Sequence, residues 1–290
     1  MQMTGQIHTY FDGTWHQGDL AVMKAGDHGA WLGSTVFDGA RMFDGKMPDL
    51  RPHMERVNRS AEAMMIEPTV SVDEWIALTR EGLTRFDKGA AVYIRPMYWA
   101  LMGNETVVQP GYGLGTGFCL ALEEIPMAAP EAATTLGKTR FRRPTLDCAV
   151  TNAKAGALYP NNGRMLAEVR ARGFGNALVC DAMGNVAESA TANVFAVQDG
   201  EVFTPIPNGT FLSGITRARH IANLRADGVR VHETVMTYAD FEQADEVFLS
   251  GNLNKVTPVT AFEDTTYEVG PMSARVRALY WDWAASDMVL

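Results

Sequence analysis

The feature that most constrains the fold is that short strand-like runs alternate with helical patterns on both sides of one break in the chain. The break is the stretch Ile125-Pro126-Met127-Ala128-Ala129-Pro130, which has two prolines, small residues and no clear period. Interleaved strands and helices are typical of layered folds that contain both. We therefore predict an α/β (α+β) fold with a smaller N-terminal domain over residues 1–125, a linker over residues 126–137 and a larger C-terminal domain over residues 138–290.

The elements expected in the N-terminal domain follow from turn and helix signals. Asp12-Gly13 predicts a hairpin turn within residues 8–15. From residue 51 onward, apolar side chains recur at helical spacing. Ser71 and Glu74 form a capping box in front of a second helix over residues 75–86. Strands are expected over residues 91–99 and 117–122.

The C-terminal domain shows the same mixture of patterns. Residues 163–172 predict a helix, and a second helix is expected after Thr216. The runs at 177–180, 194–197 and 246–250 predict strands. Hairpin turns are expected at residues 181–185 and 198–201.

Composition and charge exclude several classes of protein. Hydrophobic residues make up 47% of the 290 residues and charged residues 20%, which is a globular balance. The net charge is -9 and the basic residues are scattered, so a nucleic-acid surface is not expected. No apolar run approaches the roughly 18 residues of a membrane span, and residues 1–8 lack the pattern of a signal peptide. We therefore expect a cytoplasmic enzyme that acts on small molecules.

The cysteines and histidines give no sign of a metal site. Cys119, Cys148 and Cys180 are odd in number and far apart, so we expect buried thiols in a reducing cytoplasm rather than a disulfide or a metal centre. No histidine spacing suggests a metal either. The expected metal content is therefore none.

Lys154 is the residue that most narrows the chemistry. The chain has only six lysines, and Lys24, Lys46 and Lys88 lie in expected turns. Lys154 lies instead in Ala153-Lys154-Ala155-Gly156-Ala157-Leu158, with few charges nearby. An amine that forms a Schiff base must be partly desolvated, so that some of it is unprotonated at working pH. Composition alone leaves open that Lys154 is a surface lysine.

Other residues supply what an anionic pyridine aldehyde needs around its ring. A carboxylate that faces the ring nitrogen keeps the ring an electron sink, and Glu188 lies on a strand-like run among small residues. Tyr159, five residues after Lys154, is a candidate to hydrogen-bond the ring hydroxyl. By the residues alone, a solvent-facing glutamate at the foot of a hairpin is the more ordinary interpretation of Glu188, and Tyr159 can be a core aromatic.

A phosphate group needs backbone N–H groups at the start of a helix, together with a cation. Gly214, Ile215 and Thr216 directly precede a predicted helix, and Gly251-Asn252 lies in a second turn of small residues. Arg56 is the candidate cation. An arginine at such a helical position is also typical of a solvated surface.

These segments together resemble the class IV (fold-type IV) pyridoxal-phosphate aminotransferases, and most closely the branched-chain group. Residues 33–41 are similar to the family's G-x-x-x-F-E-G-x-R segment, with Asp38 where glutamate is usual. Residues 53–57 are similar to its H-x-x-R-L helix, and residues 93–96 match the Y-I-R-P strand of the branched-chain group. The lysine, tyrosine, glutamate and G-I-T positions of the C-terminal part match one by one, so the resemblance covers residues 9–258.

The resemblance implies a homodimer whose subunits have two α/β domains with pyridoxal 5'-phosphate between them. Lys154 would form the Schiff base and carry the proton between the substrate α-carbon and the cofactor. Glu188 would hold the ring nitrogen and Tyr159 the ring oxygen. The residues implied to hold the phosphate are Arg56, Ile215, Thr216 and Asn252, with Gly214 and Gly251 as further cofactor-binding positions.

The implied reaction moves an amino group between a branched-chain L-amino acid and 2-oxoglutarate. Tyr93 and the Gly251-Asn252-Leu253 turn would face the substrate carboxylate, and Arg41 and Arg95 the distal acid of glutamate. Leu32 departs from the pattern, since branched-chain enzymes usually carry a tyrosine there. A D-amino acid or (R)-amine aminotransferase of the same fold therefore stays open as an alternative. An aminodeoxychorismate lyase and a non-enzymatic globular protein are the further alternatives.

Overall fold

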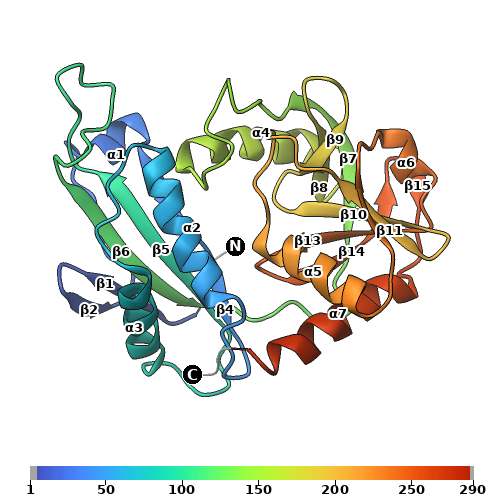
Figure 1. The fold of residues 1–290 in the computed structure, drawn as a ribbon, viewed down its shortest axis with the longest axis horizontal. Coiled ribbons are helices and arrows are strands. Elements are labelled where there is room, and N and C mark those ends of the chain that lie inside the picture. Colours follow the sequence, from blue (N-terminus) through green and yellow to red (C-terminus); the bar gives the residue numbers. More distant parts are fainter. Residues whose placement is uncertain (1–4, 288–290) are drawn as a thin grey trace. The chain divides into compact units, whose positions relative to one another are not determined.

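The computed structural model describes residues 5–287, which form two compact units (Figure 1). Unit 1 contains residues 5–127, 152–157 and 286–287, and unit 2 contains Ala128–Thr151 and Leu158–Ala285. The predicted division differs from these units in three details. Strand β7 begins at Thr134, inside the expected linker. Lys154 belongs to unit 1 although it follows that linker in the sequence, and residues 286–287 also belong to unit 1 rather than to the expected C-terminal domain.

Unit 1 is built on an antiparallel sheet. In chain order, its elements are β1 (Ile7–Phe11), β2 (Thr14–Gln17), α1 (His28–Leu32), β3 (Thr35–Phe37), β4 (Ala40–Met42), α2 (Leu50–Ala63), α3 (Val72–Leu83), β5 (Val92–Ala100) and β6 (Thr116–Glu124). Within the described part of this unit, the strand order is β2-β1-β6-β5-β3, and β4 also pairs with β5. The two long strands β5 and β6 therefore form the centre of the sheet.

Local signals explain where several of these elements begin and end. Asp12 and Gly13 join β1 to β2 with positive φ at both positions, as a two-residue hairpin turn requires, so the predicted hairpin is confirmed. The capping box of α3 is also confirmed: Ser71 Oγ accepts from the Glu74 N–H, and the Glu74 carboxylate accepts from the Ser71 N–H. Because Ser71 is the N-cap itself, α3 begins at Val72 rather than at residue 75.

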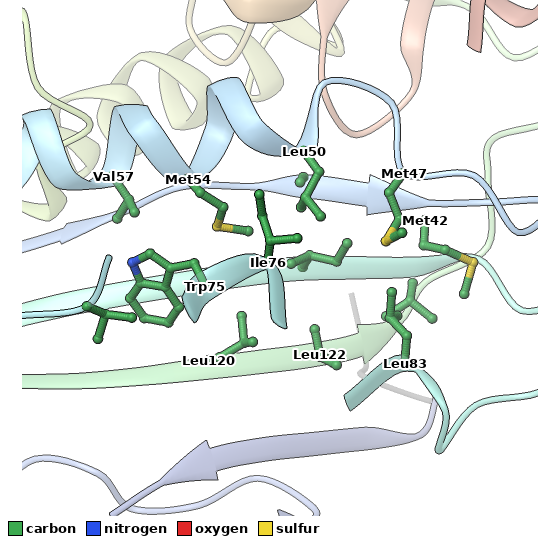
Figure 2. Close-up of a cluster of buried hydrophobic side chains, with 14 of the residues drawn as sticks. Met42, Met47, Leu50, Met54, Val57, Trp75, Ile76, Leu83, Leu120 and Leu122 are labelled. Carbon is green, nitrogen blue, oxygen red and sulfur yellow. The ribbon is translucent and has the colours of Figure 1, made fainter. Parts of the chain in front are cut away.

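Helices α2 and α3 cover one face of this sheet and form a core with it (Figure 2). The buried positions of α2 recur at helical spacing, and its proline lies in the first turn, where no intrahelical N–H is needed. Figure 2 shows Met54 and Val57 of α2 pointing toward the sheet, with Trp75 of α3 near Leu120 and Leu122 of β6. All five side chains are essentially inaccessible to solvent.

The opposite face of the same sheet carries polar side chains. Val92 and Ile94 of β5 lie in the core, so Tyr93 and Arg95 must point to the other side, because successive side chains of a strand alternate. The register places Arg41 of β4 directly opposite Tyr93. This face therefore gathers three of the residues that the sequence proposes for substrate binding.

Unit 2 is built on a mixed sheet. Its elements, in chain order, are β7 (Thr134–Arg142), α4 (Tyr159–Arg170), β8 (Asn176–Cys180), β9 (Val186–Ser189), β10 (Asn193–Gln198), β11 (Glu201–Pro205), α5 (Ile215–Ala226), β12 (Val231–Thr234), α6 (Tyr238–Glu242), β13 (Glu246–Gly251), β14 (Lys255–Phe262), β15 (Thr265–Thr266) and α7 (Pro271–Ala284). The strand order is β12-β11-β10-β13-β14-β7-β8-β9 among the described residues, with β15 paired to β14. The pairs β11–β12, β14–β7 and β7–β8 are parallel.

The central strands of unit 2 are buried on both faces. In β10, Val194 and Ala196 face a core that includes α6, whereas Phe195 and Val197 face helices α5 and α7. The ring of Phe195 stacks on that of Phe248 in β13, with centroids 4.9 Å apart. Helix α4 covers β8 through a smaller core of its own. Burial on both sides explains why these strands appear in the sequence as continuous apolar runs.

Two helices of unit 2 differ from the sequence prediction: one begins earlier than expected, and the other was not expected. Helix α4 begins at Tyr159, four residues before the expected start at 163, with Pro160 in its first turn. Helix α7 was not predicted, although Gly270 and Pro271 stand at its start in the order that such helices favour. None of the helices within residues 5–287 is long and apolar enough to cross a membrane.

The three cysteines are free thiols. Cys119 and Cys180 are buried as expected, and burial raises the pKa of the Cys119 thiol to about 12. Cys148 is exposed, so the prediction of burial is wrong for this residue.

Candidate active site

Lys154 is held by its backbone beside strand β3. Its carbonyl oxygen accepts from the Phe37 N–H at 3.2 Å, and its own N–H donates to Ser60 Oγ of α2 at 3.1 Å. Its Nζ lies 4.9 Å from the centroid of the Phe37 ring. A side chain at Gly156 would clash with Thr35, which explains a small residue there. The lysine amine is therefore presented from a fixed backbone and packs partly against an aromatic face.

Lys154 shares a face of the unit 1 sheet with the substrate-binding candidates. Phe37, whose ring contacts the Lys154 amine, is paired with Met97 of β5. Met97, Arg95 and Tyr93 alternate along β5 and point to the same side. The sheet therefore brings the predicted catalytic lysine to the same side as the predicted substrate arginine and tyrosine.

Arg41 is a buried cation with unused donors. Its exposed fraction is 0%, and Nη2 donates to the Ile125 carbonyl at 2.5 Å and contacts Met127 Sδ at 3.0 Å. Within residues 5–287, Arg41 Nε and Nη1 have no hydrogen-bond partner. Burial lowers the pKa of Arg41 to about 10, against the opposite effect of Tyr93. Two buried guanidinium donors without an acceptor are suited to an anionic ligand.

Arg95 and Tyr93 have neighbours of their own. Arg95 Nη1 lies 3.5 Å from Glu123 Oε2, and its guanidinium lies 5.9 Å from the centroid of the Tyr93 ring. A Cβ at Gly39 would clash with the Tyr93 hydroxyl, so the glycine of this segment makes room for the phenol. An anion at Arg95 would compete with Glu123, whereas one at Arg41 would not.

Arg56 belongs to a buried cluster around Asp38. The Asp38 carboxylate accepts from Arg56 Nε at 2.6 Å, from Arg56 Nη2 at 2.8 Å and from His53 Nδ1 at 2.6 Å. Burial raises the pKa of Asp38, but the charges and hydrogen bonds of Arg56 and His53 outweigh it and hold that pKa well below the usual range. Arg56 is therefore not the solvated surface residue that its helical position also allowed, because Asp38 fixes its guanidinium.

Glu188 is the buried acid of unit 2. Its Oε1 lies 2.6 Å from Arg143 Nη2, and its Oε2 accepts from Asn193 Nδ2 at 3.2 Å. Arg143 also donates to Asn162 Oδ1 at 2.8 Å and to the Thr210 carbonyl. Both side chains of the ion pair are about nine-tenths buried, so Glu188 is a fixed carboxylate rather than a solvent-facing one.

Arg143 is a residue of the candidate site that the sequence does not mark. It follows β7 as the second of two arginines before Pro144, a pattern that is also typical of a solvated loop. Its partner Glu188 is 45 positions away in the sequence, and only the folded sheet brings the two together. No local signal distinguishes Arg143 from its neighbour Arg142.

The start of helix α5 presents backbone N–H groups that have no partner within the helix. Gly214 is the N-cap, α5 begins at Ile215, and within residues 5–287 the N-cap position makes no side-chain capping hydrogen bond. The first N–H groups of a helix have no partner within it and favour anions. A Cβ at Gly214 would clash with Asn193 Oδ1. Glycine is therefore required where the helix start meets the amide that binds Glu188.

The end of β13 and the loop that joins it to β14 contain further donors. Asn252 Oδ1 accepts from Lys255 Nζ at 2.6 Å. Asn252 Nδ2 and Ser250 Oγ are buried and have no hydrogen-bond partner in the described part of the chain. Gly251 lies close to the Ala192 methyl group, and Leu253 is exposed.

The predicted site residues thus fall into two groups, one in each unit. Unit 1 contains Lys154, Arg56, Arg41, Tyr93 and Arg95. Unit 2 contains Tyr159, Glu188, Gly214, Ile215, Thr216, Gly251, Asn252 and Leu253. Thr216 is buried, whereas Tyr159 is the first residue of α4 and is 38% exposed, so it is not a core aromatic.

The fold and these residues define the class of protein. The family model of amino-transferase class IV matches residues 35–262, and the chain belongs to this family. The family and the α/β fold class predicted from the sequence are therefore confirmed.

Individual relatives narrow the comparison. The chain is 31% identical to a probable branched-chain-amino-acid aminotransferase of Rickettsia typhi, over 86% of this chain and 87% of that one. It is 28% identical to the branched-chain-amino-acid aminotransferase of Escherichia coli, over 94% and 92% of the two chains. An aminotransferase from Brucella abortus, solved bound to pyridoxal phosphate, is 52% identical with a TM-score of 0.95, over 97% of this chain and 100% of that one.

Proposed function

We propose that this protein is a pyridoxal-phosphate-dependent aminotransferase that moves an amino group between a branched-chain L-amino acid and 2-oxoglutarate. The observation that carries the proposal is the placement of Lys154 on the same face of one sheet as Tyr93 and Arg95. The names of the relatives support the substrate class, because one is named a branched-chain-amino-acid aminotransferase, one a probable branched-chain-amino-acid aminotransferase, and one an aminotransferase bound to pyridoxal phosphate.

The donor set of unit 2 fits pyridoxal phosphate. Glu188 is a buried carboxylate suited to a protonated pyridine nitrogen, and Tyr159 supplies a hydroxyl for the ring oxygen. The unpartnered Asn252 Nδ2 and the uncapped first turn of α5 are donors suited to a phosphate. The cofactor, when bound, supplies an electron-withdrawing ring that accepts the electrons of the substrate α-C–H bond.

Each residue then has a defined task. Lys154 holds the aldehyde end of the cofactor, and its Nζ moves the proton that leaves the α-carbon. Glu188 keeps the ring nitrogen protonated, and the Arg143 ion pair holds that carboxylate in place. The proposed phosphate ligands are Arg56, Gly214, Ile215, Thr216, Gly251 and Asn252, of which Arg56 is oriented by Asp38.

Arg41 is the stronger candidate for the distal carboxylate of 2-oxoglutarate. Its Nε and Nη1 are buried without an acceptor among the described residues, whereas Arg95 lies beside Glu123. Tyr93 and Leu253 are proposed to face the substrate carboxylate that both half-reactions share. The homodimer and the cytoplasmic location expected from the sequence remain part of the proposal.

A D-amino acid or (R)-amine aminotransferase is the second candidate function. Leu32, at the end of α1, is exposed and offers no hydrogen-bonding group where branched-chain enzymes usually carry a tyrosine. The two candidates share the tasks of Lys154 and Glu188. They differ only in the configuration and the side chain of the amino donor that the site accepts.

Replacement of Lys154 tests the proposed chemistry. We expect Lys154→Ala to lower kcat for the L-leucine and 2-oxoglutarate pair by about 10²–10⁴-fold, which is the range for loss of a general base. Lys138→Ala is the matched control, because Lys138 is half-exposed and pairs with Glu242 on the surface. Retention of most activity by Lys154→Ala, with both variants folded, would exclude Lys154 as the proton carrier.

A further inference from the structure

Lys255 is a buried lysine in a strained backbone conformation. It is the first residue of β14, and its exposed fraction is 1%. Lysine is almost never fully buried unless its ammonium has partners. Its φ is +64°, in the left-handed region that lysine rarely adopts. Strained backbone conformations cluster at active sites and ligand-binding segments, where the surrounding structure holds them.

The contact of Lys255 fixes the orientation of one amide. Its Nζ donates to Asn252 Oδ1 at 2.6 Å and lies 5.4 Å from the centroid of the Tyr280 ring. An ammonium group can only donate, so the amide atom facing it must be the oxygen. The amide nitrogen of Asn252 must therefore point away from Lys255. That nitrogen is buried and has no hydrogen-bond partner among residues 5–287.

A second unpartnered donor lies on the helix-covered face of this sheet. Ser250 is 1% exposed, and within the described residues its Oγ has no partner. Ser250 is paired with Asn193 across β13 and β10, so the two side chains share a face. The Asn193 amide lies against Gly214, the N-cap of α5. Ser250 Oγ is therefore on the side where α5 begins.

Helix α5 also holds Lys255 directly. The Nε2 of the buried His220, which lies on α5, contacts the Lys255 carbonyl oxygen at 3.1 Å. The donors of the β13–β14 loop and the first turn of α5 thus belong to one packed arrangement. Such a set of donors is suited to an anion with several oxygens, as a phosphate monoester has.

We propose that Lys255 is a positioning residue of the phosphate site: it fixes the Asn252 amide so that Nδ2 donates to an oxygen of the cofactor phosphate. This inference rests on the proposed function, since it requires that pyridoxal phosphate binds here. Lys255 acts through Asn252 and does not itself touch the phosphate.

The experiment compares two ligands that differ only in the phosphate. The Kd for pyridoxal phosphate and the Kd for pyridoxal are measured by spectral titration of the cofactor-free protein, for the wild type, Lys255→Met and Lys255→Gln. We expect Lys255→Met to raise the Kd for pyridoxal phosphate about 10-fold or more and the Kd for pyridoxal less than about twofold. Lys255→Gln keeps an amide donor toward Asn252 and should restore most of the affinity.

A double-mutant cycle separates positioning from general damage. In an Asn252→Thr background, the threonine hydroxyl can donate without help, so Lys255→Met should change the Kd for pyridoxal phosphate less than about twofold. If Lys255→Met does not fold, Asn252→Asp serves instead. This variant keeps an acceptor for Lys255 but removes the Nδ2 donor. It should raise the Kd for pyridoxal phosphate and leave the Kd for pyridoxal unchanged.

The outcomes distinguish this inference from the function on which it rests. If Lys255→Met raises the Kd for both ligands by the same factor, or raises neither, the positioning role is overturned while the proposed function stands. An equal effect of Lys255→Met in the wild-type and Asn252→Thr backgrounds also overturns it. A wild-type protein that binds neither ligand overturns both proposals.

Discussion

Burial of His220 makes the unfolding free energy depend on pH between about 4 and 6.5. This side chain is fully buried, and its Nε2 contacts the Lys255 carbonyl, which leaves Nδ1 buried with no partner in residues 5–287. Burial lowers the pKa of His220 from 6.5 to about 4; the Lys255 carbonyl contact opposes this, and the nearby Lys255 charge adds to it. Between these two pH values the unfolded chain binds a proton that the folded protein does not. Stability is therefore lost as pH falls from 6.5 toward 4.

The size of this effect follows from the two pKa values. The difference between 6.5 and about 4 corresponds to about 3 kcal/mol of unfolding free energy, at about 1.36 kcal/mol for each pH unit. Between pH 7.5 and pH 5, about 2 kcal/mol of it should be lost. The variant His220→Gln keeps a donor for the Lys255 carbonyl and has no group that titrates in this window.

Urea unfolding of the two proteins at pH 7.5 and pH 5 measures the effect. The wild type should lose about 2 kcal/mol more than His220→Gln over this interval, because acidic groups titrate alike in both proteins. Equal losses in the two proteins would refute the reasoning, since His220 would then take up its proton as easily when folded as when unfolded.

Two further predictions concern the ionic groups of the site. Arg143→Met should lower the unfolding free energy by about 3 kcal/mol at neutral pH, because it leaves the Glu188 carboxylate buried without its cation; a urea midpoint unchanged from that of the wild type would contradict this. Arg41→Met should raise the KM for 2-oxoglutarate by about 10-fold or more and leave the KM for L-leucine nearly unchanged, whereas Arg95→Met should have a smaller effect. Steady-state kinetics with each substrate varied in turn decides, and equal effects of the two arginine variants would contradict the assignment.

Local signals in the sequence were enough to place many of the elements. The Asp12-Gly13 turn needs only two residues that tolerate positive φ, and the capping box of α3 is complete within four residues. The start of α4 was misplaced although Pro160 marked it. The apolar period begins only at Met165, so the preference of proline for a first turn is the one signal of the earlier start.

The contacts of the site residues could not be predicted from their neighbours in the sequence, because the contacting residues are far apart along the chain. Lys154 was expected in the C-terminal domain, but its backbone pairs with β3 of unit 1 across more than a hundred positions. Arg143 and Glu188 meet only because β7, β8 and β9 are neighbours in one sheet. Burial of Arg41 and Lys255 is likewise decided by tertiary packing, since nothing in their sequence neighbourhoods marks a buried charge.

The most direct test of the proposed function is a spectral titration of the purified protein loaded with pyridoxal phosphate. L-leucine and D-alanine are added to separate samples, and the visible absorbance band of the bound cofactor is followed. Loss of the band with L-leucine, and not with D-alanine, is the predicted result. Loss with D-alanine alone would contradict the branched-chain assignment and would make Leu32 the first residue to exchange for tyrosine.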